Sequence, residues 1–278
     1  MTTTVPFGLA EQTEIRAYTD FAAGSPTHLR EALGIATLRV GPALALVIRA
    51  DPSRFFNRVG GFRPDEPITP DTVARVCDFY REQGVPQGSF MIAPSMLPPD
   101  WAATAEKLNL TEGNRLVKLG LDIEAAAPAA DGTRPLDPGL RVGPVGPDEA
   151  EEWATVMMTT FGLTGPGLID MAAACVGRPD WRQFAVRDGA RIIAVGSVFV
   201  NGVCADMFGG ATLPEGRGRG AQSALLAARV AAARSAGCRW LVAETGAEGP
   251  GEHNSSLHNM LRTGFQPLYE RTTWLWRE

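Results

Sequence analysis

The chain has 278 residues, 45% of them hydrophobic and 21% charged, which is ordinary for a globular protein and leaves room for two domains of about 100 to 150 residues. Its net charge of −5 argues against a nucleic-acid partner, because such binding normally needs an excess of Lys and Arg. No stretch approaches the roughly 18 apolar residues of a membrane span, and no secretory signal opens the chain, so we expect a cytoplasmic protein with no membrane partner.

Cysteines and histidines do not follow the spacing of a metal site. The four cysteines are far apart and form no C-x-x-C pair. The chain has three histidines, His28, His253 and His258, and we expect the last two at the surface. We therefore expect reduced thiols and no metal cofactor.

Strand and helix patterns alternate in the N-terminal half from residue 55 onward. The segment FFNRVGGFRP predicts an apolar strand that is followed by Gly-Gly and a proline. Apolar periodicity then predicts, in order, a helix at 70–84, a strand at 88–94, a short helix at 100–109 and a strand at 114–123.

Residues 125–139, AAAPAADGTRPLDPG, interrupt this periodicity with Ala, Pro, Gly and Asp, as is typical of a linker. We therefore predict two domains, 1–124 and 140–278, joined by this linker.

The C-terminal half contains strong turn signals. Asp188-Gly189 and Asn201-Gly202 break the segment 181–212 into three apolar runs, as tight hairpins do. A helix from Gln222 to Ala236 should end at Gly237. The other predicted elements are a strand at 140–145, helices at 147–162 and 167–180, a strand at 239–244, a short helix at 254–264 and two closing strands within 265–276.

A glycine-rich loop precedes the predicted helix at Gln222. In LPEGRGRGAQSALL, the alternating Gly216, Gly218 and Gly220 allow backbone N–H groups to approach a ligand closely, and the helix start adds unpaired donors. Arg217 and Arg219 can pair with phosphates. The loop therefore predicts a phosphate-binding site.

Two other phosphate-binding motifs fit less well. The glycines also match part of the dinucleotide fingerprint, but Leu213-Pro214-Glu215 separates them from the preceding strand and too little chain follows for six strands. A Walker A loop is excluded because no Gly-Lys-Ser/Thr occurs.

The element order and two motifs of residues 140–278 resemble the Gcn5-related N-acetyltransferase (GNAT) superfamily. The glycine loop looks like its acetyl-CoA signature, and SSLHNMLRTGFQPLYER is similar to its later motif of a short helix ending in Gly-Phe before a final hairpin. The resemblance implies an α/β (α+β) fold with a mixed, mostly antiparallel sheet flanked by helices. It also implies that the loop amides hold the CoA pyrophosphate while two strands splay to admit pantetheine. The residues expected to contact acetyl-CoA are Gly210, Ala211, Thr212, Leu213, Arg217, Gly218, Arg219, Gly220, Ala221, Gln222, Asn254, Ser256 and Asn259.

Several of these residues have ordinary structural alternatives. Asn254 and the serines beside it can equally cap the short helix, and one of the two arginines can simply be solvated.

The N-terminal half looks like a second, degenerate copy of the same unit. FFNRVGGFRP parallels ADMFGGATLP, and the elements that follow come in the same order. The corresponding loop, RPDEPITPD, has three prolines without N–H donors and three acids that repel phosphate. We expect two tandem GNAT-like domains in which this half shapes the acceptor site and binds no CoA; an unrelated α/β module is the alternative.

Three residues are candidates for the chemistry. Glu244, at the end of a strand, is the first choice of base, and Asp206 is the second. Met260 occupies the position where the family usually has a tyrosine that protonates the thiolate, so Tyr269 is the candidate for that hydroxyl. Their structural alternatives are an ion pair of Glu244 with an arginine such as Arg271, an exposed strand position for Asp206 and a core aromatic for Tyr269.

The expected activity is direct transfer of an acetyl group from acetyl-CoA to the amine of a small molecule, in a ternary complex, with a homodimer as an allowed assembly. The alternative is a catalytically idle acyl-CoA-binding or interaction protein.

Overall fold

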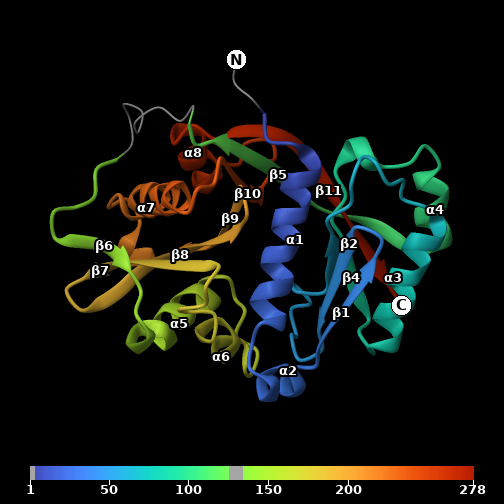
Figure 1. Ribbon diagram of the computed structural model, residues 1–278, viewed down its shortest axis with the longest axis horizontal. Helices are drawn as coiled ribbons and strands as arrows, with labels where there is room; N and C mark the ends of the chain where they lie inside the picture. Colours follow the sequence, from blue (N-terminus) through green and yellow to red (C-terminus); the bar gives the residue numbers. More distant parts are fainter. Residues whose placement is uncertain (1–3, 125–133) are drawn as a thin grey trace.

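The computed structural model describes residues 4–124 and 134–278 (Figure 1). The first half contains α1 (Phe7–Ala23), α2 (Thr27–Leu33), β1 (Ile35–Val40), β2 (Ala43–Ile48), β3 (Arg58–Gly60), α3 (Pro70–Glu82), β4 (Gln87–Phe90), α4 (Trp101–Lys107) and β5 (Leu110–Asp122). The second half contains β6 (Leu140–Pro144), α5 (Ala150–Thr160), α6 (Leu168–Ala173), β7 (Trp181–Asp188), β8 (Arg191–Asn201), β9 (Cys204–Thr212), α7 (Ala221–Ser235), β10 (Trp240–Gly246), α8 (Ser255–Arg262) and β11 (Gln266–Arg277).

The two halves repeat one order of elements. Two helices, three strands, a helix, a strand, a helix and a strand occur from α1 to β5 and again from α5 to β11, with β6 added before the second set. All strands belong to one sheet with the order β1-β2-β3-β4-β11-β5-β10-β9-β8-β7-β6. Only β3–β4 and β9–β10 are parallel among the described pairs. The predicted mixed, mostly antiparallel sheet and the repeat are confirmed.

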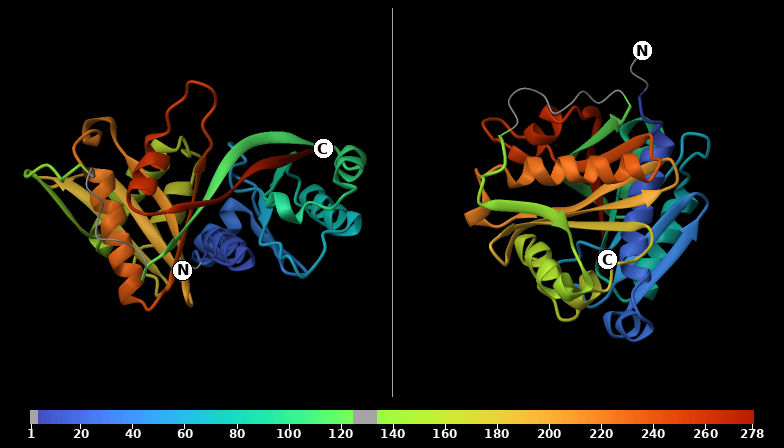
Figure 2. Two further views of the ribbon diagram at one scale, coloured as in Figure 1. Left: turned by 90° about the horizontal axis from the view of Figure 1, so that it is seen from above. Right: turned by 60° about the vertical axis from the view of Figure 1, so that its left-hand side comes forward.

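The last strands of the two halves are exchanged. β5 of the first half pairs with β10, from Trp240 opposite Asp122 to Gly246 opposite Leu116. β11 of the second half pairs with β4 and lies between β4 and β5. Figure 2 shows these two long strands running side by side from one half into the other. A fragment of residues 140–278 would therefore leave the edge of β10 without its partner.

Local turn predictions hold in the second half. β7–β8 and β8–β9 are tight hairpins that turn at Gly189 and Gly202, whose φ values are 59° and 61°. The predicted closing pair of strands is wrong, because residues 266–277 form one long strand with two irregularities. This strand stays extended because β5 pairs with it along most of its length.

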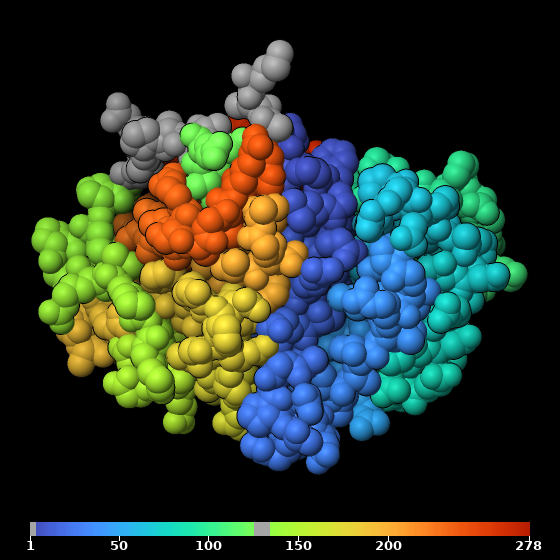
Figure 3. Space-filling view, in the orientation of Figure 1, coloured from blue at the N-terminus to red at the C-terminus, as the bar shows by residue number. Residues whose placement is uncertain are grey.

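Helices cover both faces of β10. Ala10 of α1 packs with Trp240 and Val242, whereas Leu226 of α7 packs with Leu241 and Ala243. Since successive strand residues point to opposite faces, α1 lies on one face and α7 with α8 on the other. Figure 3 shows α1, in dark blue, filling the space between the two halves.

Within residues 4–124 and 134–278, no helix combines the length and apolar character needed to cross a membrane. The four cysteines are buried and form no disulfide with one another.

Candidate active site

β9 and β10 separate in the middle of the sheet. They pair in parallel from Trp240 opposite Cys204 to Val242 opposite Asp206, and no pairing between them continues beyond this point. β9 nevertheless runs on to Thr212, and β10 to Gly246. The two strands therefore form a fork that opens directly after Asp206, as the predicted splay requires.

A cavity of about 670 Å³ lies at this fork. On one face of the sheet it is lined by Glu14 and Tyr18 of α1, and on the other by Gln222 and Arg229 of α7. Since these helices cover opposite faces, the cavity connects the two faces where β9 and β10 part. Its volume is in the range of small-molecule sites.

The glycine loop has the backbone of an anion site. Gly218 and Gly220 have φ values of 69° and 78°, which favour glycine. Within the described chain, the N–H groups of Gly218, Arg219 and Gly220 donate to no acceptor. The first turn of α7 adds donors that the helix itself leaves unpaired.

The two arginines of the loop differ. Arg217 is exposed and forms no ion pair with any described residue. Arg219 already pairs with Asp188 at 2.7 Å and with Asp137 at 3.2 Å. Arg217 is therefore the more available of the two for a ligand phosphate.

The end of the predicted linker packs against this loop. The N–H of Asp137 donates to the carbonyl of Arg219 at 3.0 Å. The carbonyl of Pro135 approaches so closely that a Cβ on Gly220 would lie 2.2 Å from it. Residues 134–138 thus belong to the wall of the loop, and residues 125–133 of the predicted linker lie outside the described residues.

Three side chains predicted to face CoA form hydrogen bonds between α7 and α8. Gln222 Nε2 donates to Ser256 Oγ at 3.1 Å, and Asn259 Nδ2 donates to Gln222 Oε1. Asn254 is the N-cap of α8: its Oδ1 accepts from the N–H groups of Ser256 and Leu257 at 3.0 and 3.2 Å. Of these predicted contacts, Gln222 and Ser256 line the cavity.

The remaining predicted CoA contacts lie at the end of β9 and the start of α7. Gly210 lines the cavity. Ala211 and Thr212 pair with β8, and the N–H of Leu213 donates to the carbonyl of Ile193 at 2.9 Å. Ala221 is buried under β6 to β8 and is absent from the cavity wall.

Asp206 lies at the fork itself. The residue is 5% exposed and lines the cavity. Burial raises the pKa of its carboxyl to about 7, although Lys118 and Arg229 act in the opposite direction. No described residue forms a salt bridge with it, so this carboxylate can accept a proton near neutral pH.

Glu244 also lines the cavity, but it is held in a buried ion cluster. Its Oε2 lies 2.5 Å from Arg271 Nη2, which confirms the alternative of an ion pair. Arg271 also contacts Glu11 and Glu14. Burial raises the pKa of Glu244 to about 7, with Arg271 opposing and Glu14 adding to the shift. Glu244 is thus less available for proton transfer than Asp206.

Tyr269 belongs to the same cluster. Its hydroxyl donates to Glu11 Oε1, and its ring contacts Phe7 edge-on with centroids 5.6 Å apart. Burial, reinforced by Glu11, raises the pKa of Tyr269 above its ordinary value. The side chain does not line the cavity, and it joins β11 to α1.

Sequence reasoning missed two residues of the first half. Tyr18 of α1 lines the cavity, and burial raises its pKa to about 12. The guanidinium of Arg58 lies 3.8 Å from the centre of the Tyr18 ring and donates to the carbonyl of Phe55. Tyr18 belongs to no motif, and Arg58 stands in FFNRVGGFRP, which predicted only a strand. Only the folded chain brings the two residues to the fork.

Comparisons with known proteins define the fold. No protein-family model matches the chain, and no curated protein matches it. Similar solved structures include a GCN5-related N-acetyltransferase from Kribbella flavida, with 14% identity, a TM-score of 0.66, and coverage of 97% of this chain and 96% of that one. A GCN5-related N-acetyltransferase from Sphaerobacter thermophilus has 14% identity and a TM-score of 0.62, covering 98% and 94% of the two chains. A tandem GNAT protein from the clavulanic acid biosynthesis pathway has 15% identity and a TM-score of 0.59, covering 99% and 97%.

Proposed function

Because the chain has the tandem fold of the GCN5-related N-acetyltransferases, we propose that it transfers an acetyl group from acetyl-CoA to the amine of a small molecule. The observation that carries the proposal is the cavity that crosses the sheet at the fork of β9 and β10, with the buried carboxyl of Asp206 on its wall.

Acetyl-CoA would enter from the face that α7 and α8 cover. The N–H groups of Gly218 to Gly220, which no described acceptor occupies, and the exposed Arg217 suit the pyrophosphate. The fork beside Gly210 offers a passage for pantetheine between the strands. This arrangement would bring the thioester to Asp206.

The acceptor would bind on the opposite face, between the two halves. There the wall is formed by α1, by residues 53–56, which include the aromatic Phe55 and Phe56, and by Arg58. The first half itself lacks a comparable phosphate loop: Thr69 Oγ1 accepts the N–H of Thr72 at the start of α3, and Pro70 has no N–H. We therefore assign acceptor binding, and no CoA binding, to the first half.

In the proposed reaction, Asp206 takes the proton of the bound ammonium, since an ammonium has no lone pair with which to attack. The neutral amine then attacks the thioester carbonyl and a C–N bond forms. The C–S bond breaks as CoA leaves as a thiolate, and this sulfur takes the second proton that the nitrogen loses when the amide forms. The Tyr18 hydroxyl, which burial keeps protonated, would donate a hydrogen bond to that thiolate.

The test is an acetyl-transfer assay of the full chain with a panel of small primary amines, read by mass spectrometry of the acetylated product and by release of free thiol. We expect turnover of at least one amine and its loss in Asp206→Asn. Saturable CoA binding without turnover of any amine would instead favour the idle acyl-CoA-binding protein. Absence of CoA binding would overturn both functions.

A further inference from the structure

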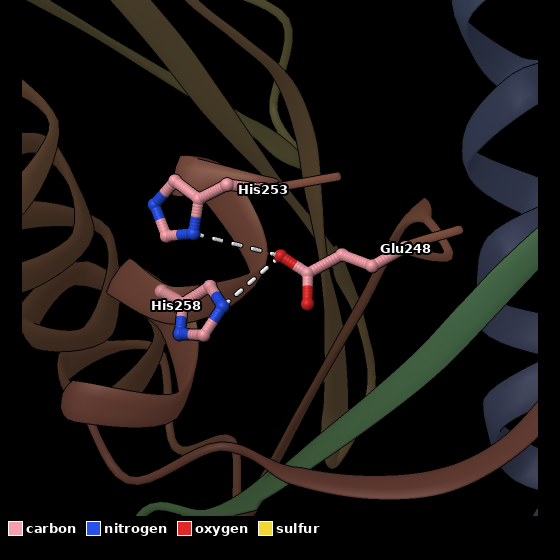
Figure 4. Close-up of side chains that lie close together, drawn as sticks. All are labelled: Glu248, His253 and His258. Carbon is pink, nitrogen blue, oxygen red and sulfur yellow. Dashed lines mark hydrogen bonds and ion pairs between the residues drawn. The ribbon is translucent and has the colours of Figure 1, made fainter. Parts of the chain in front are cut away.

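A cluster of two histidines and one glutamate lies outside the cavity, on the segment that joins β10 to α8. Glu248 and His253 belong to residues 247–254, and His258 belongs to α8. One donor atom of each side chain lies within 4.8 Å of the other two. Figure 4 shows both imidazole rings turned toward the same carboxylate oxygen.

We propose that this cluster binds a divalent transition-metal ion of the zinc class. His258 Nε2 lies 3.0 Å from Glu248 Oε1, and His253 Nδ1 lies 3.8 Å from it. Zinc holds nitrogen and oxygen ligands at about 2.0 to 2.2 Å in tetrahedral geometry, so that neighbouring ligand atoms are about 3.3 Å apart. The two distances from the imidazole nitrogens to Glu248 Oε1 lie on either side of 3.3 Å, which is about the spacing of zinc ligands. Small rotations of the side chains would bring the three ligand atoms around one ion.

The ligand set is partly held in place before any ion binds. The N–H of Asn254 donates to Glu248 Oε1 at 2.5 Å and so fixes the position of this carboxylate oxygen. The rings of His253 and His258 stack with centroids 4.5 Å apart. A pre-positioned carboxylate and two paired rings reduce the entropy that would be lost on binding an ion.

Exposure and chemistry favour zinc-class ions over the common hard cations. The side chains of His253, His258 and Glu248 are 68%, 38% and 26% exposed, so an ion can enter and water can complete its coordination. Two imidazoles and one carboxylate form a donor set that zinc uses, whereas Mg²⁺ and Ca²⁺ prefer oxygen ligands. All four cysteines are buried, which leaves no exposed thiol to compete for the ion.

A bound ion would stabilise the wall of the cavity that Gly246 and Ser256 form. It would link residues 247–254 to α8 through the side chains of Glu248 and His258. Asn254, between them, caps α8 and also donates to the carbonyl of Gly246 at 2.7 Å. Because Gly246 and Ser256 both line the cavity, the ion would stabilise the side on which acetyl-CoA is proposed to bind.

The experiment is a Zn²⁺ titration of the full chain, without a histidine tag, by calorimetry and by thermal unfolding, with Co²⁺ as a spectroscopic probe. We expect one ion per chain, a rise in melting temperature with free Zn²⁺, visible absorption typical of a tetrahedral Co²⁺ site, and no such response to Mg²⁺.

Variants identify the ligands. His253→Ala and His258→Ala should each weaken Zn²⁺ binding by at least about tenfold. Glu248→Gln should weaken it as well, although its amide oxygen can still accept the N–H of Asn254. His28→Ala is the matched control, because His28 is exposed in α2 and far from the cluster in sequence, and it should leave affinity unchanged. Absence of saturable Zn²⁺ binding, or equal binding by the His253→Ala and His258→Ala variants and the unmodified chain, would overturn the proposal. Neither readout depends on acetyl transfer.

Discussion

Arg271 on the last strand donates to both carboxylate oxygens of Glu14 on the first helix, at 2.9 and 2.7 Å. The Arg271 side chain is completely buried, and that of Glu14 is 7% exposed. Burial opposes ionisation of Glu14, but Arg271 and Lys118 outweigh it and hold its pKa well below the ordinary value. The ion pairs of Arg271 with Glu11 and Glu14 hold α1 against the sheet next to the fork. They thereby position the wall of the cavity that α1 forms.

Replacing Arg271 with methionine should destabilise the protein strongly. The change leaves Glu11 and Glu14 without their shared cation in a buried place, which typically costs about 3 to 5 kcal/mol. Urea unfolding at neutral pH measures the loss in the free energy of unfolding. As a control, Arg115→Met removes an exposed pair with Glu270 and should change the free energy of unfolding by less than about 1 kcal/mol. Equal effects of the two substitutions would show that the buried cluster adds no stability.

Asp206→Asn should lower turnover by roughly 10²-fold at neutral pH, because the amide cannot accept the proton of the acceptor ammonium. The unmodified protein should gain activity as pH rises through about 7, since its raised pKa means that the carboxyl becomes ionised there. The defect of the variant should shrink as pH approaches the pKa of the amine, because a free amine needs no base. Glu244→Gln serves as the comparison, and a larger loss for Glu244→Gln than for Asp206→Asn would identify Glu244 as the base.

The same Asp206→Asn variant should be more stable than the unmodified protein above pH 7. Burial raises the folded-state pKa from 3.8 to about 7, so the folded protein holds a proton that the unfolded chain releases between these values. Stability from this group is therefore present below pH 4 and lost as pH rises to about 7. Urea unfolding at pH 8 should show a gain of at most about 4 kcal/mol for the variant, and a much smaller difference at pH 4. If the difference in unfolding free energy between the variant and the unmodified protein were the same at pH 8 as at pH 4, the raised pKa of Asp206 would be contradicted.

Tyr18→Phe should lower turnover by roughly tenfold without changing the acetyl-CoA KM. The ring keeps its contacts with Arg58 and Phe208, and only the hydroxyl is lost. The effect is modest because a thiolate leaves tolerably well near its own pKa of about 8.5. Tyr269→Phe is the matched control: it removes the hydrogen bond to Glu11, so it should reduce stability and leave the turnover of the folded protein unchanged. Full activity of Tyr18→Phe would remove this hydroxyl from the mechanism.

Arg217→Ala should raise the acetyl-CoA KM by about tenfold or more, because a charged hydrogen bond contributes about 1.5 to 3 kcal/mol. Arg219→Ala should have the smaller effect on KM, since Asp137 and Asp188 already occupy that guanidinium. Steady-state kinetics with saturating acceptor measure both constants. Arg81→Ala, which removes an exposed pair with Asp78 in the first half, is the control. An unchanged KM in Arg217→Ala would show that this arginine is only solvated.

The turns and helix ends of the second half could be predicted from the amino-acid sequence. Asp188-Gly189 and Asn201-Gly202 predicted the hairpins, and Gly237 predicted the end of α7, because turn geometry depends on a few adjacent residues. The repeated order of elements in the two halves was also predictable, and the resemblance to the GNAT superfamily implied the separation of β9 from β10.

The pairing of strands that are far apart in the chain could not be predicted from the sequence. The exchange of β5 and β11 depends on which strand edges meet in the complete sheet. The arrival of Tyr18 and Arg58 at the fork, and the meeting of His253 and His258 with Glu248, likewise arise only after folding. Burial then sets the pKa of Asp206, because the cost of a charge depends on the water and the charges around it in three dimensions.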